Sequence, residues 1–243
     1  MSTLKRRAPR CVGHKGAAHL APGNTLESFR AAILAGVDMI EFDVLPENRD
    51  GSGRLLLAHD YEALKQGTPL TLEEGLEHLS GERYAGIELD VDVKLPGYGA
   101  RVVSALRQAG LIERSLVSGT FSCELDAIRA LEPELRLGWS VPRARRDYTD
   151  DMLTAIPALA ALSGYRALLP RRARRCLGSG RFDAIMAHWR LVTPRLVQAV
   201  AEGGGELYVW TVDDAALMER LTALGVDGII TNDPTLFSRL ESD

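Results

Sequence analysis

The sequence predicts one α/β domain that folds as a single parallel (β/α)8 TIM-type barrel. Short apolar β-type segments alternate with amphipathic helical segments from one end of the chain to the other, and eight such β-type segments can be counted. A glycine-rich dinucleotide loop after the first strand would favour a doubly wound open sheet, but no such loop follows the first β-type segment. A length of 243 residues suits one such barrel, so we expect residues 1–243 to form a single domain.

The eight expected strands are short runs rich in β-branched and aliphatic residues, and most of them end in polar side chains. In chain order they are 11–14, 39–43, 86–94, 116–119, 137–141, 184–188, 207–211 and 228–231. Apolar residues spaced three or four apart fill the intervals and predict helices. The expected helices are 26–35, 72–79, 100–109, 124–131, 194–201 and 215–224. Residues 143–181 contain Pro157, Pro170 and two arginine clusters, and the pattern sets no boundaries there.

A ninth β-type run, 54–59, has no helix before it and follows the turn signal Asp50-Gly51-Ser52-Gly53. Residues 44–59 therefore predict a β-hairpin after the second strand. Positions 43 and 59 lie symmetrically about Gly51, so an antiparallel ribbon would return His59 to the level of Asp43.

Chemically versatile side chains stand where these first segments end. His14 ends the first strand, Glu41 and Asp43 end the second, and His59 ends the hairpin. Two carboxylates one residue apart on a strand point the same way and can share one divalent ion. Two imidazoles can act as general base and general acid near neutral pH. This set of residues indicates metal-assisted hydrolysis of an anionic ester.

The third strand carries more charge than a purely structural strand needs. Residues 88, 90, 92 and 94 face one side of it, which must be the barrel interior because the aliphatic residues face the other. Unpaired carboxylates there would be costly, so a cation or Lys94 should compensate them. Asp92, nearest the carboxyl end, is the expected third metal ligand, and Asp90 is the alternative. Glu41, Asp43 and Asp92 would hold Mg²⁺ or Ca²⁺, which prefer oxygen ligands.

Composition excludes several other classes of protein. A net charge of −4 argues against a general nucleic-acid binder. Three widely spaced cysteines predict neither a disulfide framework nor a zinc site. The basic first ten residues lead into no apolar segment, and no stretch approaches membrane-spanning length. We therefore expect a cytoplasmic protein without a transmembrane segment; its oligomeric state stays open.

Several motifs occur in a characteristic order. They are His14-Lys15-Gly16, Ala-Pro-Gly-Asn-Thr at 21–25, Glu41-Phe42-Asp43-Val44, His59-Asp60, Asp92-Val93-Lys94, Trp210-Thr211-Val212-Asp213 and Gly-Val-Asp-Gly-Ile-Ile-Thr-Asn-Asp-Pro at 225–234. This series resembles the motifs of the glycerophosphodiester phosphodiesterase family. The corresponding family motifs are His-Arg-Gly, Ala-Pro-Glu-Asn-Thr, Glu-x-Asp-Val, His-Asp, Glu-x-Lys, Trp-Thr-Val-Asn and Gly-x-Asp-Gly-x-x-Thr-Asp-x-Pro.

The resemblance implies a hydrolase of lipid metabolism that cleaves glycerophosphodiester- or lysophospholipid-like substrates with a divalent metal ion. His14 would activate the nucleophile, and His59, oriented by Asp60, would protonate the leaving alcohol. Lys15 and Lys94 would contact the substrate phosphate, and Trp210 would line the pocket. The sequence does not fix which histidine plays which part.

Two alternatives remain open. A phospholipase D-type lyase would use the same residues with an internal hydroxyl as nucleophile and would release a cyclic phosphate. A degenerate, non-catalytic barrel would only bind a phosphoryl ligand. The family carries an insertion after the second His-Asp that helps to enclose glycerol, whereas here only about ten residues separate His59-Asp60 from the segment 69–74. We therefore expect an open mouth that tolerates a headgroup larger than glycerol.

Overall fold

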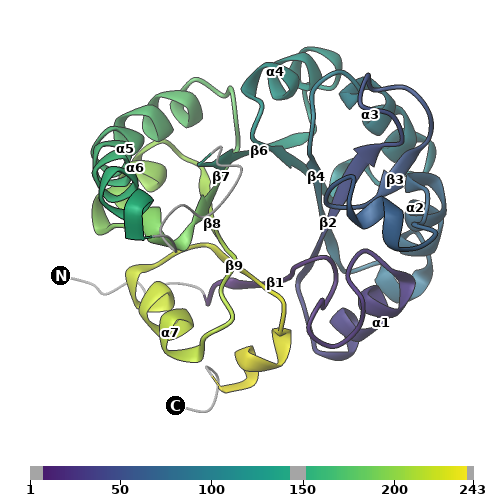
Figure 1. Ribbon diagram of the computed structural model, residues 1–243, viewed down its shortest axis with the longest axis horizontal. Helices are drawn as coiled ribbons and strands as arrows, with labels where there is room; N and C mark the ends of the chain where they lie inside the picture. Colours follow the sequence, from purple (N-terminus) through teal and green to yellow (C-terminus); the bar gives the residue numbers. More distant parts are fainter. Residues whose placement is uncertain (1–7, 143–151, 240–243) are drawn as a thin grey trace.

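Eight parallel strands close into a barrel in the computed structural model, which describes residues 8–142 and 152–239 (Figure 1). Strand β1 pairs with both β9 and β2, and these pairings close the ring. The predicted (β/α)8 fold is therefore confirmed. The barrel strands are β1 (Arg10–Gly13), β2 (Met39–Pro46), β4 (Glu88–Val93), β5 (Ser115–Gly119), β6 (Arg136–Val141), β7 (Ala184–His188), β8 (Glu206–Trp210) and β9 (Gly228–Thr231).

The predicted hairpin is confirmed, but its register differs from the expected one. Strand β3 (Leu55–Leu57) runs antiparallel to β2, and Val44 pairs with Leu57. Continuing this ladder places Ala58, not His59, opposite Asp43. The turn closes where the Asn48 N–H donates to the Ser52 carbonyl, so it is centred on residue 50 instead of 51. Gly53, at a φ of 80°, is then accommodated as an extra residue in the returning strand.

Helices surround the barrel, and threonine or aspartate side chains begin several of them. Thr25 and Thr71 form capping boxes with residues three positions later, and Asp214 accepts a hydrogen bond from the Leu217 N–H. The helices are α1 (Leu26–Leu34), α2 (Leu72–Leu79), α3 (Gly99–Gln108), α4 (Ser122–Leu131), α5 (Met152–Gly178), α6 (Pro194–Glu202) and α7 (Ala215–Leu224). Within the described residues, a 3₁₀ helix, η5 (Pro234–Arg239), follows β9 in place of an eighth α-helix.

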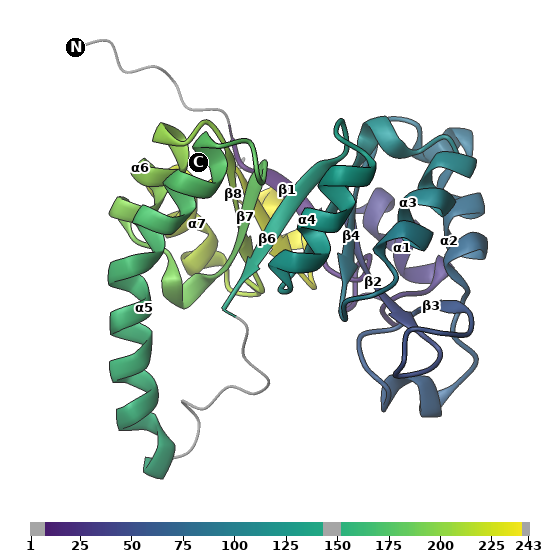
Figure 2. The same cartoon turned by 90° about the horizontal axis from the view of Figure 1, so that it is seen from above.

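The segment without predicted boundaries contains α5, which includes both Pro157 and Pro170. Figure 2 shows that the first turns of α5 extend past the barrel on the same side as the hairpin of β2 and β3. The strands end on that side, so the barrel mouth lies between these two projections. Of the helices that the structure describes, none combines the length and the apolar character needed to cross a membrane.

Two apolar layers hold the barrel together. The outer layer lies between strands and helices and includes Phe29 and Phe42, whose ring centroids are 5.7 Å apart. The inner layer fills the barrel with Val12, Met186 and Tyr208, among others. Because strand residues alternate between these layers, Glu41 points inward while its neighbour Phe42 packs outward.

Charged side chains close the amino-terminal end of the barrel and form what we call the barrel floor. The floor consists of Arg10, Glu88, Arg136 and Glu206 with the hydroxyl group of Tyr208. Arg10 Nη1 lies 2.6 Å from Glu206 Oε1, and Arg136 Nη1 lies 2.9 Å from Glu88 Oε2. Arg136 also contacts Glu206, so the ion pairs span four strands.

Candidate active site

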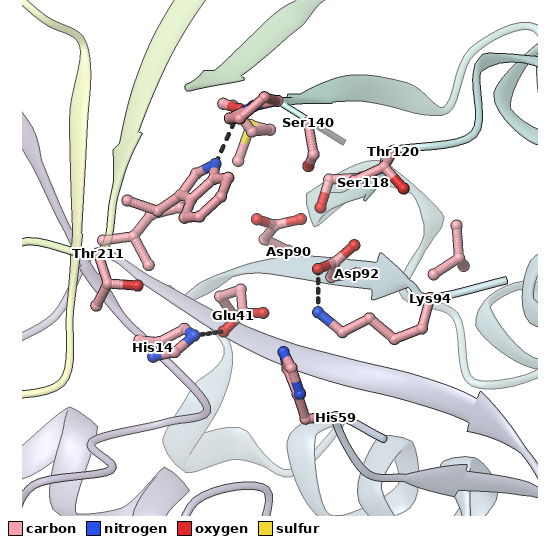
Figure 3. A pocket seen from close by; sticks show the side chains of 15 residues that line it. His14, Glu41, His59, Asp90, Asp92, Lys94, Ser118, Thr120, Ser140 and Thr211 are labelled. Carbon is pink, nitrogen blue, oxygen red and sulfur yellow. Dashed lines mark hydrogen bonds and ion pairs between the residues drawn. The ribbon is translucent and has the colours of Figure 1, made fainter. Parts of the chain in front are cut away.

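A cavity of about 320 Å³ opens at the carboxyl ends of the strands. All eight barrel strands contribute residues to it, and most of these residues lie near the carboxyl ends of the strands, where active sites of this fold are found. Figure 3 shows the carboxylates of Glu41 on β2 and of Asp90 and Asp92 on β4 close together in this cavity, with the rings of His14 and His59 beside them. The lining residues are His14, Glu41, His59, Asp90, Asp92, Val93, Lys94, Ser118, Thr120, Ser140, Pro142, Met186, Trp210, Thr211 and Ile230.

The three predicted metal ligands lie together. Glu41, Asp43 and Asp92 each offer a carboxylate oxygen within 4.8 Å of the others. The parallel register explains this proximity, because Asp43 on β2 pairs with Asp92 on β4. The Lys94 ammonium group contacts the carboxylates of both Asp43 and Asp92.

The charges in this carboxylate group are only partly balanced. Burial and the neighbouring Asp43 carboxylate raise the pKa of Glu41 well above its usual range. Burial also opposes ionisation of Asp43, but the charges of Lys94 and Lys15 outweigh it and hold the pKa of Asp43 well below its usual range. The raised pKa of Glu41 thus reflects first its burial and then the negative charge of the neighbouring carboxylates. Three clustered carboxylates, two of which contact the Lys94 ammonium group, fit a hard divalent cation, which prefers oxygen ligands.

Asp90 lies deeper in the barrel than Asp92 and does not belong to this group. Its side chain is buried, and its Oδ1 has no hydrogen-bond partner among the described residues. Burial and the charge of Asp92 raise the pKa of Asp90 to about 8, although a hydrogen bond with Ser118 acts in the opposite direction.

His14 is held in place by strand β9. Its backbone N–H donates to the Thr231 carbonyl at 2.8 Å, and its ring Nδ1 lies 2.7 Å from Asn232 Oδ1. Ring Nε2 lies 3.9 Å from Glu41 Oε2 and so faces the carboxylates. Burial and the positive charge of Lys15 lower the pKa of His14 to about 4.

The turn after His14 orients Glu41. Lys15 has a φ of 52°, and its backbone N–H donates to Glu41 Oε2 at 2.8 Å. Gly16 follows at a φ of 87°, where a Cβ would lie 2.5 Å from Ser28 Oγ. The turn therefore requires a residue without a side chain at position 16.

His59 lies beyond the end of β3 and is far more open to solvent than His14. Its side chain is 52% exposed, against 20% for His14. His59 Nδ1 lies 3.0 Å from Asp60 Oδ2, and Asp60 Oδ1 accepts hydrogen bonds from the backbone N–H groups of Glu62 and Ala63. The hydrogen bond with His59, followed by that from Ala63, lowers the pKa of Asp60.

The remaining predicted site residues occupy different positions. Lys15 does not line the cavity, and its Nζ lies 3.7 Å from Asp43 Oδ2. Trp210 lines the cavity and donates from its Nε1 to the Met186 carbonyl at 2.9 Å. His188 meets the Trp210 ring edge-to-face, with 5.1 Å between the ring centroids.

Three residues with no role predicted from the sequence hold the site together. Asn24 donates from Nδ2 to Asp43 Oδ2 at 2.9 Å and accepts at its Oδ1 from the Asp43 N–H at 3.1 Å. Asp213 accepts from Asn232 Nδ2 at 2.6 Å, and Asn232 in turn contacts His14. All three lie within the series of motifs noted in the sequence, but no sequence signal predicts which side chains they contact.

Comparison with known proteins gives consistent matches over most of the chain. The model of the "Glycerophosphoryl diester phosphodiesterase family" matches residues 14–68 and 71–236. A glycerophosphodiester phosphodiesterase of Caldanaerobacter subterraneus subsp. tengcongensis is 27% identical, over 92% of this chain and 93% of its own. Another from Arabidopsis thaliana is 29% identical, over 97% of this chain and 74% of its own.

Solved structures share the fold. A putative glycerophosphoryl diester phosphodiesterase from Silicibacter pomeroyi has a TM-score of 0.74 at 20% identity, covering 96% of this chain and 92% of its own. An Oleispira antarctica phosphodiesterase, solved in complex with the product sn-glycerol-3-phosphate, has a TM-score of 0.69 at 21% identity, covering 97% of this chain and 98% of its own.

Proposed function

The chain belongs to the glycerophosphoryl diester phosphodiesterase family and is a phosphoric diester hydrolase, and we propose that it cleaves glycerophosphodiesters and lysophospholipid-like diesters with residues of the barrel mouth. One observation carries the proposal: His14, His59 and two of the three clustered carboxylates line the same cavity. The product bound to the Oleispira relative, sn-glycerol-3-phosphate, supports the glycerophosphodiester class of substrate.

Glu41, Asp43 and Asp92 would hold Mg²⁺ or Ca²⁺. A divalent cation there supplies Lewis-acid stabilisation of charge on the phosphoryl oxygens. The Lys94 ammonium group, which already contacts Asp43 and Asp92, adds positive charge on the same side of the cavity. Asn24 would hold the Asp43 carboxylate in the orientation in which it can bind both the divalent cation and the Lys94 ammonium group.

The two histidines suit opposite proton transfers. His14 points Nε2 toward the carboxylates and is bound at Nδ1, so this ring would take the proton from the nucleophile. His59 is exposed and its Nδ1 is bound to Asp60, so its Nε2 would protonate the alcohol as it leaves toward solvent. Residues 1–243 would serve this reaction as one barrel domain.

A second candidate reaction is attack by a hydroxyl group of the substrate itself, which gives a cyclic phosphate. The exposure of His59 favours it, because the short segment between β3 and α2 leaves room for a large headgroup bearing such a hydroxyl. His14 would remove the proton of that hydroxyl, a new P–O bond would close the ring, and His59 would protonate the departing alcohol.

Phosphorus NMR of the products tests both reactions. A panel of glycerophosphodiesters and bulkier lysophospholipids is incubated with and without Mg²⁺ or Ca²⁺. We expect metal-dependent loss of the diester signal, with a phosphomonoester product for hydrolysis and a cyclic diester for internal attack. Glu41→Ala should abolish turnover, while Glu73→Ala, on the exposed face of α2, should not. A barrel that consumes no diester with either ion would contradict the proposal and would indicate a binding protein.

A further inference from the structure

Asn232 stands between His14 and the carboxylate of Asp213. Its Oδ1 lies 2.7 Å from His14 Nδ1, and its Nδ2 donates to Asp213 Oδ2 at 2.6 Å. The chain of contacts therefore runs from β8 through the end of β9 to the end of β1. None of these contacts was predicted from the sequence.

Asp213 can only accept hydrogen bonds here. Its Oδ1 accepts from the Asn232 backbone N–H at 2.8 Å and from Thr231 Oγ1 at 3.0 Å, and its Oδ2 accepts from the Asn232 amide. Because both oxygens face donors, the amide nitrogen of Asn232 must point toward Asp213. The amide oxygen then points toward His14.

This orientation selects one tautomer of His14. An amide oxygen is an acceptor, so the ring nitrogen that faces it must carry the proton. His14 is therefore protonated at Nδ1, and the lone pair of Nε2 is directed toward the carboxylates and the cavity. A ring with the opposite tautomer would have no acceptor site facing the substrate.

The two positions differ from the motifs that this chain resembles. At position 213 the family motif has asparagine, and at position 232 it has aspartate; this chain has Asp213 and Asn232. The carboxylate and the amide have exchanged places, and the structure brings the two exchanged positions into contact.

We propose that Asp213 and Asn232 are an exchanged pair of positioning residues that act on His14 by fixing its tautomer. The inference rests on the proposed function for the role of His14 as the base. Its structural part concerns the tautomer and can be tested separately.

Because one residue of the pair is a carboxylate and the other an amide, replacing either one alone breaks the match between donors and acceptors. In Asp213→Asn, the single oxygen of the new amide serves the backbone N–H of Asn232, and its NH₂ group faces the Asn232 side chain. Asn232 then turns its oxygen toward residue 213 and its nitrogen toward His14, which reverses the tautomer. In Asn232→Asp, two carboxylates meet at a contact that is now 2.6 Å, so their charges repel each other.

The double variant Asp213→Asn/Asn232→Asp restores complementarity. The carboxylate then accepts from His14 Nδ1 on one side and from the new amide on the other. Asp214→Asn is the matched control, because it makes the same change one residue away, where asparagine caps α7 as well as aspartate does.

The experiment measures the ¹⁵N chemical shifts of the His14 ring near neutral pH, assigned with a His14→Gln variant, together with kcat on an alkyl diester. We expect Asp213→Asn to move the ring proton to Nε2 and to lower kcat by about 10- to 100-fold. The double variant should recover the Nδ1–H tautomer and most of the activity. Asp214→Asn should match the parent in both measurements, and thermal unfolding should show that every variant is folded.

Two outcomes separate the inference from the proposed function. If His14 keeps its proton on Nδ1 in Asp213→Asn, or if the double variant fails to recover the tautomer, the positioning inference is wrong. If the tautomer changes as expected while kcat stays at the parent value, the inference stands and His14 is not the catalytic base.

Discussion

Asp90 and Asp92 differ by two positions on one strand and by their surroundings. Asp92 has a carboxylate oxygen within 4.8 Å of those of Glu41 and Asp43, whereas Asp90 lies below it beside Ser118. The sequence could place both on the inner face of the strand, because alternation alone sets that. The register pairs Asp90 with Glu41 and Asp92 with Asp43, and it is Asp92 whose carboxylate oxygen comes within 4.8 Å of both other carboxylates.

Asp92→Asn should weaken Mg²⁺ and Ca²⁺ binding by at least about tenfold, because it removes a charged ligand. Asp90→Asn makes the same change on the same strand and should leave metal affinity nearly unaltered. Titration calorimetry of the two variants measures this difference. A larger loss in Asp90→Asn than in Asp92→Asn would show that the third ligand is misassigned.

His59→Ala should discriminate between leaving groups. A general acid matters least when the leaving group departs easily, so an aryl phosphodiester should react at nearly the parent rate. An alkyl diester should react about 10²- to 10⁴-fold more slowly. Steady-state rates on the two substrates check this, with His14→Ala expected to impair both. If instead His14→Ala spares the aryl ester and His59→Ala does not, the two proton-transfer roles are reversed.

At the scale of elements, the hairpin of β2 and β3 brings His59 to the mouth, and it is clamped from outside. Arg101 on α3 donates from Nη1 to the Gly51 carbonyl at 3.0 Å and from Nη2 to the Gly53 carbonyl at 2.6 Å. The turn signal at residues 50–53 predicted the hairpin. It could not predict the register, which depends on how the turn closes and on where the extra residue is accommodated.

Arg101→Gln should loosen the hairpin with little effect on the barrel. We expect faster hydrogen exchange of the amides in β3, a loss of about 1 kcal/mol or less in global stability, and a several-fold lower kcat on alkyl diesters, which depend on His59. Arg107→Gln, on the same helix but paired with Glu132, is the control and should change none of the three. Unchanged exchange in β3 would show that the clamp does not hold the hairpin.

The bounds of helix α5 could not be predicted from the sequence pattern. Proline inside a helix removes a backbone donor and usually ends or bends it, so Pro157 and Pro170 gave no clear boundary. The structure continues the helix from Met152 to Gly178 through both positions.

Across the whole molecule, the alternation of apolar strands and amphipathic helices was enough to predict the barrel. The barrel floor was not predicted, because Arg10, Glu88, Arg136 and Glu206 are far apart in the sequence and meet only when the ring closes. Burial opposes ionisation of Glu206, but the hydrogen bond from Arg10 and the charges of Arg136 and Arg10 outweigh it and lower the pKa of Glu206.

Glu206→Gln should destabilise the protein in a pH-dependent way. A carboxyl group whose pKa is lower in the folded state contributes stability above its ordinary pKa and loses it as the pH falls through the folded value. At neutral pH the variant should be less stable by about 1–3 kcal/mol, and the difference should shrink in acid below the ordinary pKa of glutamate. Urea unfolding at several pH values measures it.

The matched control is Glu202→Gln, whose carboxylate is 43% exposed and pairs with Arg174 on the surface. Its effect on the unfolding free energy should be much smaller than that of Glu206→Gln at neutral pH, because an exposed ion pair contributes little to stability. A difference in unfolding free energy between Glu206→Gln and the parent that does not change with pH would contradict the charge-based explanation.

The ion pairs of the barrel floor lie at the end of the barrel opposite the mouth, so we expect molecules that enter the cavity through the mouth to leave by the same route. In the proposed reaction the alcohol would be released beside the exposed His59 and would depart first. The phosphorylated product would stay on the buried side of the cavity, where the carboxylates and Lys94 lie, and would depart last. It would then occupy the side chains that the next diester needs, so we expect the phosphorylated product to inhibit the enzyme competitively.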